Sequence, residues 1–412
     1  MFPLSLFAVL ACAQQLPEPV RFTAGSQSVA YYHQPGDAPA VLLILPNQPE
    51  TPAAEWKSWQ AVAASRKWHL VFPSAGAVGD AGVKLLEAIT GHLRAQPALG
   101  KAAIYLAGGG GATPMVFYGA NRAPHLFSAA LAIGGSPAAA IETDRIFGAN
   151  TNNLPIAWAV SPQEKSAASD SLYRLNVGGY KLEILESPST AQALDFLAKA
   201  GYNPLPRSID CETGNPAFAR CYWITPVAFD GNLRNDIVRA TKIQPGSMAS
   251  LDFGGFGFAP DKPGPGIVVE FLPPKYSGPL KLNDRIVALS GSPVADARHY
   301  SELMGQVRDE RPVAVTIERG AGKEKERIRL TTRYVLRKRE ETLTVRLQAE
   351  YLPDGKEISI VSRAIAALQI TVPAEWVPAA VSWNGTQMAT PQAAGCYLLT
   401  LQEPGSARPC GR

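Results

Sequence analysis

The 412-residue sequence is poor in cysteine and histidine, with five of each, and only 18% of its residues are charged. The formal net charge at neutral pH is +4, and both signs are spread along the chain. One basic cluster stands out, at residues 333–339, and neither an aromatic platform nor a nucleic-acid-binding motif accompanies it. We therefore interpret the cluster as a solvated face beside a strand, and we expect no nucleic-acid partner.

The spacing of the cysteines argues against a metal centre. No two of them are in C-x-x-C spacing and few histidines lie near them, so we expect neither a zinc site nor a cofactor. If Cys12 is removed with a leader, an even number remains, which fits disulfides in an exported chain. Of the three possible pairings we favour the local one, Cys211 with Cys221 and Cys396 with Cys410.

Long apolar runs are missing beyond the N-terminus, and none approaches the ~18 residues of a membrane span. Residues 2–11 are apolar and lead into Ala11-Cys12-Ala13, a small-x-small cleavage site. This pattern predicts a signal peptide over residues 1–13, although no Lys or Arg precedes the apolar stretch. Alternatively, Cys12 is a bacterial lipoprotein cysteine that carries a lipid anchor. Both interpretations place the protein outside the cytoplasm, secreted or in the periplasm and cell envelope.

The periodicity of apolar residues divides the rest of the chain into parts. Over residues 20–206, apolar runs of strand length alternate with helical stripes, which predicts a doubly wound parallel sheet. Residues 207–244 are expected to form a connector. Short strands and one helix follow over residues 245–332, an α+β pattern, and residues 333–412 are expected to form a small all-β, sandwich-like domain.

A glycine-rich turn is the most informative stretch of the first part. An apolar run at residues 102–106 is followed by Gly108-Gly109-Gly110-Gly111 and then by the opening of a helix. Strand, sharp turn and helix form the frame of the nucleophile elbow of serine hydrolases. In the G-x-S-x-G register the nucleophile falls at Gly110, and a shift by one residue reaches another glycine. The run also lacks the Lys-Ser/Thr of a phosphate-binding loop, so we expect no nucleotide there.

Together with residues 41–46, 68–73 and 124–127, this turn resembles the α/β-hydrolase family, in particular secreted esterases of the polyhydroxybutyrate-depolymerase and feruloyl-esterase kind. The resemblance implies that fold, and a nucleophile, a base, an acid and oxyanion donors at set positions. The oxyanion segment reads Pro46-Asn47-Gln48-Pro49, in which the prolines have no N–H group. None of the five histidines falls at the base position. We therefore expect a non-catalytic pseudo-esterase.

An active hydrolase with an atypical constellation is the alternative. Glu164 follows the strand expected at residues 156–160, where the family places its acid. Ser187 and Ser189 lie in the segment that should carry the histidine. These three side chains are the candidates for residual chemistry.

Two motifs stand out in residues 245–332. Gly255-Phe256-Gly257-Phe258 is similar to a Gly-Leu-Gly-Phe loop, and residues 278–291 are similar to a G-x-L-x-x-G-D-x-I core with Asn283 for Gly and Ser290 for Asn. On these residues the stretch resembles a PDZ domain. The resemblance implies that this loop holds a peptide's terminal carboxylate and that the peptide pairs with the strand that follows. By register, His299 and Leu303 would face the peptide.

Proline interrupts residues 259–265, and proline cannot donate to a strand ladder. A structural spacer is therefore the alternative to a peptide-binding module. The combined expectation is an exported non-catalytic protein that binds protein C-termini or extended peptides. A protease accessory factor is a further alternative.

Overall fold

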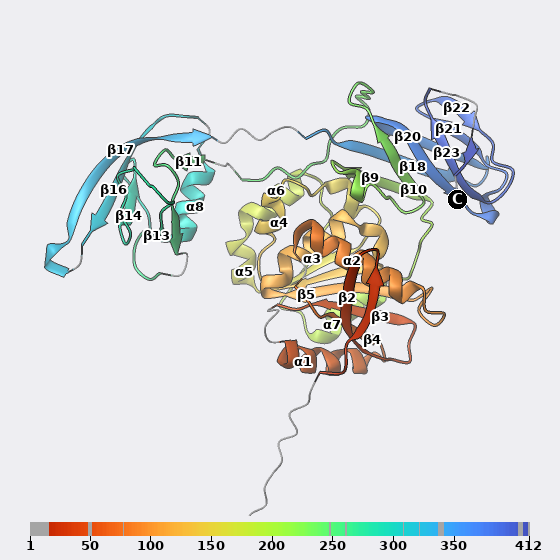
Figure 1. Cartoon of the computed structure of the whole chain (residues 1–412), viewed down its shortest axis with the longest axis horizontal. Coiled ribbons are helices and arrows are strands. Elements are labelled where there is room, and N and C mark those ends of the chain that lie inside the picture. Colours follow the sequence, from red (N-terminus) through yellow and green to blue (C-terminus); the bar gives the residue numbers. More distant parts are fainter. Residues whose placement is uncertain are drawn as a thin grey trace, which may run out of the picture. The chain divides into compact units, whose positions relative to one another are not determined.

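The structure is a computed structural model that describes residues 16–47, 52–76, 78–246, 249–259, 262–307, 309–320, 322–336, 342–402 and 407–410. The expected signal peptide and Cys12 lie outside these ranges. The chain forms two compact units (Figure 1): one combines residues 1–244 with 342–412, and the other consists of residues 245–341. No helix among the described residues has the length and apolar character to cross a membrane.

An eight-stranded mixed sheet organises the first part of the first unit, in the order β1-β2-β4-β3-β5-β6-β7-β8. Strands β3 to β8 are parallel, whereas β2 runs antiparallel to both β1 and β4. This is an α/β-hydrolase-like sheet, and its antiparallel edge corrects the expectation of a wholly parallel one. The strands are β1 Val20–Ala24, β2 Gln27–Gln34, β3 Ala40–Leu45, β4 His69–Pro73, β5 Ala103–Gly109, β6 Ala129–Ile133, β7 Ile156–Val160 and β8 Glu183–Glu186.

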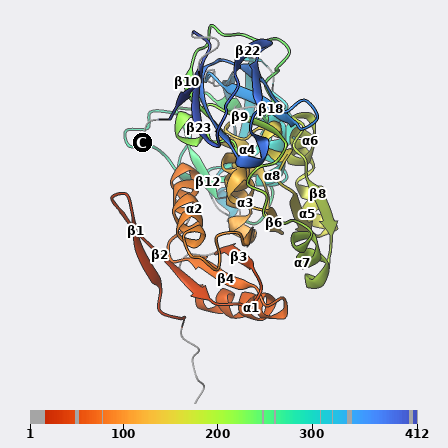
Figure 2. The same ribbon diagram turned by 90° about the vertical axis from the view of Figure 1, so that its right-hand side faces the viewer.

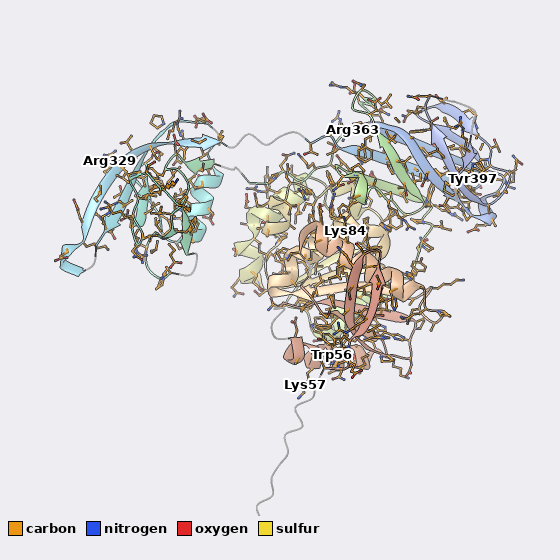
Figure 3. All side chains as sticks on the ribbon, viewed as in Figure 1. Trp56, Lys57, Lys84, Arg329, Arg363 and Tyr397 are labelled. Atoms are coloured by element: carbon orange, nitrogen blue, oxygen red, sulfur yellow. A yellow bond between two sulfur atoms is a disulfide. The ribbon has the colours of Figure 1, made fainter. Side chains whose placement is uncertain are left out.

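Helices cover both faces of this sheet because its central strands are apolar on both sides (Figure 2). All six residues of β3 are buried; Val41, Leu43 and Leu45 face one core and Leu42 the other. Trp56 of α1, labelled in Figure 3, packs on this second face, where its ring contacts the rings of Phe72 and Tyr32. The first core includes residues of α2 Gly79–Arg94, α3 Thr113–Arg122, α4 Ala138–Glu142 and α6 Ser169–Val177, and the second includes residues of α1 Pro52–Ser65 and α7 Thr190–Ala198.

The rest of the first unit is a pair of sheets that share one apolar core. One sheet has the order β22-β21-β19-β18-β9 and the other β10-β20-β23-β24. The strands are β9 Ser208–Thr213, β10 Ile224–Phe229, β18 Val345–Leu352, β19 Glu357–Arg363, β20 Ile365–Val372, β21 Ala380–Trp383, β22 Thr386–Ala389, β23 Gly395–Thr400 and β24 Arg408–Pro409.

The stretch expected as a connector is therefore structured. β9 pairs with β18, and β10 pairs with β20, so residues 208–229 contribute a strand to each sheet of the β-rich part. Cys211 is bonded to Cys221 and Cys396 to Cys410, the local pairing that the sequence favours. Both disulfides fit a protein of an oxidising compartment.

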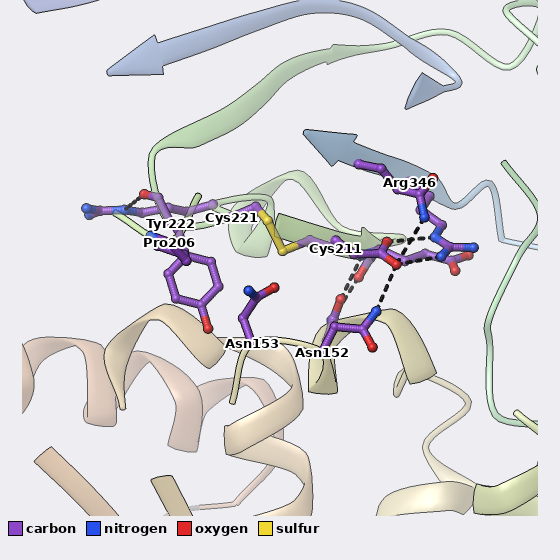
Figure 4. Close-up of a disulfide and its surroundings, with 12 residues drawn as sticks. Asn152, Asn153, Pro206, Cys211, Cys221, Tyr222 and Arg346 are labelled. Carbon is purple, nitrogen blue, oxygen red and sulfur yellow. Dashed lines mark hydrogen bonds and ion pairs between the residues drawn. A yellow bond between two sulfur atoms is a disulfide. The ribbon is translucent and has the colours of Figure 1, made fainter. Parts of the chain in front are cut away.

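Polar contacts around β9 join the two parts of the first unit. Near the Cys211–Cys221 disulfide, Asp210 binds Arg346 of β18 and the Asn152 side chain (Figure 4). The neighbouring Glu212 side chain is fully buried and paired with Arg363 at 3.0 Å. It also accepts hydrogen bonds from three further groups, Thr241 N, Thr241 Oγ1 and Thr344 Oγ1.

The second unit is a curled sheet with one helix. Its sheet has the order β11-β17-β16-β14-β13-β12, with β15 paired to β14. β17 belongs to this unit although it extends past residue 332, so the expected start of the last domain at residue 333 falls inside a strand. The elements are β11 Ala249–Leu251, β12 Gly257–Ala259, β13 Ile267–Phe271, β14 Arg285–Leu289, β15 Ser292–Pro293, α8 Ala297–Gly305, β16 Pro312–Arg319 and β17 Glu326–Leu336.

Candidate functional site

The turn between β5 and α3 has the backbone of a nucleophile elbow. β5 ends at Gly109, Gly110 follows with φ +53°, and η1 Gly110–Ala112 leads directly into α3. A nucleophile elbow likewise holds its residue in a strained strand-to-helix turn. Gly110 adopts this left-handed conformation without the Cβ penalty that another residue would incur.

The space beside Gly110 is occupied by the side chain of Asn47, which follows β3. A Cβ placed on Gly110 would lie 2.8 Å from Asn47 Oδ1, closer than Cβ atoms approach other atoms. Gly111 N donates a hydrogen bond to that same oxygen. Asn47 N donates in turn to Glu55 Oε2 of α1 at 2.9 Å.

These two N–H groups are the donors that matter for acyl-transfer chemistry. An oxyanion hole on this fold uses the N–H of the residue after the nucleophile and one from the loop after the third strand. Here those groups belong to Gly111 and Asn47, and both already have acceptors within the protein. The loop after β3 therefore still has a backbone N–H group, that of Asn47, but this group donates to Glu55.

A second glycine pair closes the other side of the elbow. Gly134 and Gly135, after β6, have φ +57° and +65°. A Cβ on Gly135 would lie 2.3 Å from the carbonyl oxygen of Gly110, so only glycine fits there. The Gly134 carbonyl accepts hydrogen bonds from Thr113 Oγ1 and from the Trp158 indole, both at 2.8 Å. The elbow is therefore tightly held by the loops around it.

Glu164, the candidate acid, caps a helix. It is the third residue of α5 Pro162–Ala167, and it forms a reciprocal capping box with Ser161. Its Oε1 also accepts Gly135 N at 3.2 Å. Hydrogen bonds from the Ser161 backbone and hydroxyl, together with that from Gly135, hold the pKa of Glu164 below its usual range. This carboxylate is thus stabilised in its ionised form.

The two candidate serines lie at the end of β8, where their surroundings are structural. Ser187 has φ +44°, and its N–H donates to the Val160 carbonyl. Ser189 is the N-cap of α7, in a capping box with Gln192. The Ser189 hydroxyl is bonded to Gln192, and among the described residues no histidine is a hydrogen-bond partner of either hydroxyl.

The histidines of the first unit lie elsewhere. His33 Nε2 and His69 Nδ1 are 3.2 Å apart, on the neighbouring strands β2 and β4. His92 stacks on Phe22. Burial lowers the pKa of His125 to about 3, with a further contribution from Arg220, and its Nδ1 is buried without a hydrogen-bond partner.

Two concave regions flank the elbow. Asn47 and Gly111 line a cavity of about 280 Å³ between the elbow, α3 and α4. Glu55, Glu164, Ser187 and Ser189 line a larger groove of about 660 Å³. The structure thus brings the three side chains suggested by the sequence into one groove, together with Glu55, which sequence reasoning missed. Asn47 was considered only as part of a loop poor in donors, and its contact with Gly111 spans 64 residues.

In the second unit, the residues expected to bind a peptide surround the short strand β12. Gly254 and Gly255 have φ +79° and +80°, which turns the chain from β11 into β12. β12 is the last strand of its sheet path, and it pairs with β13. Phe258 of β12 meets the ring of Tyr300 on α8, with centroids 5.4 Å apart. The edge strand and the helix are therefore in direct contact.

The remaining two expected residues lie on α8. His299 N donates to Asp296 Oδ1, the N-cap, at 2.7 Å, and the His299 Nδ1 atom accepts Ala295 N at 3.2 Å. Leu303 is partly buried against the apolar core, as are Phe256 and Phe258. The His299 ring therefore has a structural partner at the start of the helix.

Asn283 and Ser290, the two positions that depart from the expected motif, both have a left-handed backbone. Asn283 has φ +68° and Ser290 has φ +48°. Between them, the buried Asp284 side chain forms a two-point contact with Arg319, at 2.8 and 2.7 Å. The β13–β14 and β14–β15 turns are thus maintained without the usual glycine and asparagine.

Comparison with known proteins gives structural neighbours only. No protein-family model matches the chain, and no curated protein matches it. Among solved structures, Est1E from Butyrivibrio proteoclasticus is 10% identical with a TM-score of 0.34, over 44% of this chain and 98% of its own. A dienelactone hydrolase from Anabaena variabilis is 12% identical with a TM-score of 0.33, over 45% of this chain and 100% of its own. The fluorophosphonate-binding serine hydrolase F of Staphylococcus aureus is 11% identical with a TM-score of 0.34, over 43% and 97%.

The strand order of the mixed sheet, β1-β2-β4-β3-β5-β6-β7-β8, gives the first part of the chain an α/β-hydrolase-like fold.

Proposed function

We propose that the chain is a non-catalytic member of its fold class, exported from the cell, that binds extended peptides or protein C-termini through its second unit. The observation that carries the first half is the contact of Asn47 with Gly110 and Gly111. An acyl transfer requires a nucleophile and a free pair of N–H donors. The elbow has glycine at the nucleophile position, and its two donors bind Asn47 and Glu55.

The absent base supports the same conclusion. Loss of a nucleophile or a base alone removes most of the rate of such enzymes, and the effects of the two are not additive. Glu164 and Ser189 are engaged in helix caps, which accounts for both side chains without assigning them a role in catalysis.

Catalysis is tested with the purified full-length protein. We expect no turnover of p-nitrophenyl acetate or butyrate above the buffer rate, and no labelling by a fluorophosphonate probe. The denatured protein serves as the labelling control. Labelling that depends on the folded state, and that a Ser187→Ala or Ser189→Ala variant abolishes, would show instead that the chain is an active hydrolase.

The peptide-binding half rests on β12 being an edge strand that contacts α8. A peptide adds to such an edge through backbone hydrogen bonds, and side-chain pockets then provide specificity. Gly254 and Gly255, both with positive φ, produce a turn directly before β12, in keeping with the PDZ resemblance.

This half is tested by fluorescence polarisation with a library of C-terminal peptides, each prepared with a free and with an amidated terminus. We expect binding to need the free carboxylate. Leu303→Ala should weaken binding about tenfold through loss of apolar contact, about 1.4 kcal/mol. Leu282→Ala removes an exposed side chain of the same unit and should have no effect. Equal binding of free and amidated peptides would exclude carboxylate capture.

A further inference from the structure

The groove of about 660 Å³ lies at the carboxyl ends of β6, β7 and β8. In open α/β sheets, ligands bind at this edge, and the volume is within the range of small-molecule sites, about 300–1,000 Å³. Besides the strand ends, the groove is lined by the loops that lead from β7 into α5 and from β8 into α7. Its position is independent of the second unit and of peptide binding.

The interior of the groove is apolar. Leu131 and Ile133 of β6 and Ala159 and Val160 of β7 line it. The partly buried Trp59 of α1 and Leu194 of α7 line it as well. Such a surface fits the flat, apolar body of a small organic molecule.

The charged groups that line the groove are all of one sign. Among the residues that the structure describes, Glu55 and Glu164 line it and no Lys, Arg or His does so. Both carboxylates are fixed in place by backbone donors, Glu55 by Asn47 N and Glu164 by Ser161 N at 3.0 Å. Each carboxylate has two oxygens and about four acceptor sites, so these bonds leave acceptor capacity on both.

The opposing electrostatic influence is the N-terminus of α7, where Ser189 lines the groove. A helix N-terminus is equivalent to about half a positive charge, whereas the two ionised carboxylates contribute two full negative charges. The N-terminus of α5 is already capped by Glu164. The balance therefore favours a cationic ligand. The Trp59 ring adds to this preference, because an indole face attracts a cation.

We infer that this groove binds an organic amine with an aromatic or other apolar body, whose ammonium group lies between Glu55 and Glu164. The inference goes beyond the proposed function, because neither the non-catalytic elbow nor the peptide edge requires a small-molecule ligand. It follows that the first unit is a ligand-binding domain in its own right.

The test compares two probes of the same body and opposite charge, tryptamine and indole-3-propionate. Isothermal titration calorimetry with the full-length protein in low salt should give measurable binding of tryptamine, and binding of the acid at least tenfold weaker. Added sodium chloride should weaken tryptamine binding, because salt screens partly exposed charges. If the acid binds as tightly as the amine, or more tightly, or if neither binds, the inference is wrong.

A double variant then locates the site. Glu55→Gln with Glu164→Gln removes both charges and keeps both acceptors, and glutamine is also accepted in a capping box. Tryptamine binding should fall at least tenfold in this variant. Asp195→Asn, on α7 but outside the lining, is the matched control and should bind tryptamine as before.

An unchanged affinity in the double variant would place the amine elsewhere and overturn the assignment. The probe comparison uses the unaltered protein, so it stands even if the variant fails to fold. Turnover of an ester would contradict the proposed non-catalytic role without affecting the amine result, so failures of the two can be told apart.

Discussion

The side-chain oxygen of Asn47 accepts the backbone N–H of Gly111, the residue that follows the nucleophile position of the elbow. One asparagine thus fills the space that a serine side chain would need and occupies a donor that an oxyanion would need. The space for a nucleophile and the free oxyanion donor are thus both taken by one side chain. A serine at position 110 alone would therefore leave Gly111 N bonded to Asn47.

Gly110→Ser is expected to leave the protein inactive and to destabilise it. The left-handed backbone costs a non-glycine residue about 1–2 kcal/mol. In addition, the exposed Asn47 side chain must shift, because its Oδ1 would lie 2.8 Å from the new Cβ. Thermal unfolding and ester turnover measure the two effects. Adding Asn47→Gly should recover part of the lost stability by removing the contact.

Gly91→Ser is the control for that substitution. Gly91 is in α2, and a Cβ there would meet nothing within 4 Å. Serine in a helix is favoured over glycine, so this variant should be at least as stable as the parent. A Gly110→Ser protein as stable as the Gly91→Ser protein would show that Asn47 does not restrict the elbow.

Glu212→Gln should be strongly destabilising. The Glu212 side chain is fully buried and paired with Arg363. Removing one partner of a buried ion pair typically lowers stability by about 3–5 kcal/mol. Urea unfolding of the full-length protein measures the loss. Arg66→Gln disrupts the exposed pair with Asp195 and should cost less than about 1 kcal/mol. Equal effects of the two would show that burial of the Glu212–Arg363 pair does not raise the cost of disrupting it.

His125 should make stability depend on pH. Its pKa is lowered to about 3 in the folded protein, while the unfolded chain binds the proton near pH 6.5. Between these values the unfolded state holds more protons, so stability falls as the pH falls, by up to about 1.4 kcal/mol per pH unit. His125→Gln should reduce this slope.

Denaturant midpoints at pH 7, 6 and 5 measure that slope for the parent and the variant. Leu126→Ala provides the comparison, because it removes a neighbouring apolar side chain with no titratable group. It should lower stability by a similar amount at each pH. A slope that His125→Gln leaves unchanged would assign the pH dependence to other groups.

Asn283 should tolerate glycine better than alanine. Its φ of +68° suits glycine, whereas alanine in this region is disfavoured by about 1 kcal/mol or more. Asn283→Gly is therefore expected to be neutral or stabilising, and Asn283→Ala destabilising, in thermal unfolding of the second unit. The opposite order would mean that the asparagine side chain matters more than its backbone.

The sequence predicted well those features that depend on local pattern. The apolar runs at residues 40–45 and 156–160 are β3 and β7, because a strand covered on both faces has to be apolar throughout. The cysteines paired locally, since 10 and 14 residues separate the two partners of each bond. The glycine turn also has the backbone expected for an elbow.

Features that depend on distant residues could not be read in the same way. The pairing of Ser208–Thr213 with β18 joins residues more than 130 positions apart. For this reason the sequence indicated a connector where the structure has a strand. The role of Asn47 could not be predicted, because it depends on contacts with Glu55 and Gly111. Neither hydrophobic periodicity nor a sequence motif indicates these contacts. Trp59 lines the groove together with residues of β6, β7 and α7, and its place in the sequence gives no sign of these neighbours.

The order of the strands along the chain has a consequence for biosynthesis. β9 and β10 are made before residues 245–341, and their partners β18 and β20 are made after them. During synthesis, the edges of β9 and β10 therefore remain unpaired while more than a hundred further residues are added. Unpaired strand edges favour aggregation. The inserted second unit can complete its own sheet in this interval. The pairing of β9 with β18 and of β10 with β20 is therefore completed last. A chain truncated before residue 345 leaves these edges unpaired and is a candidate for chaperone binding or proteolysis.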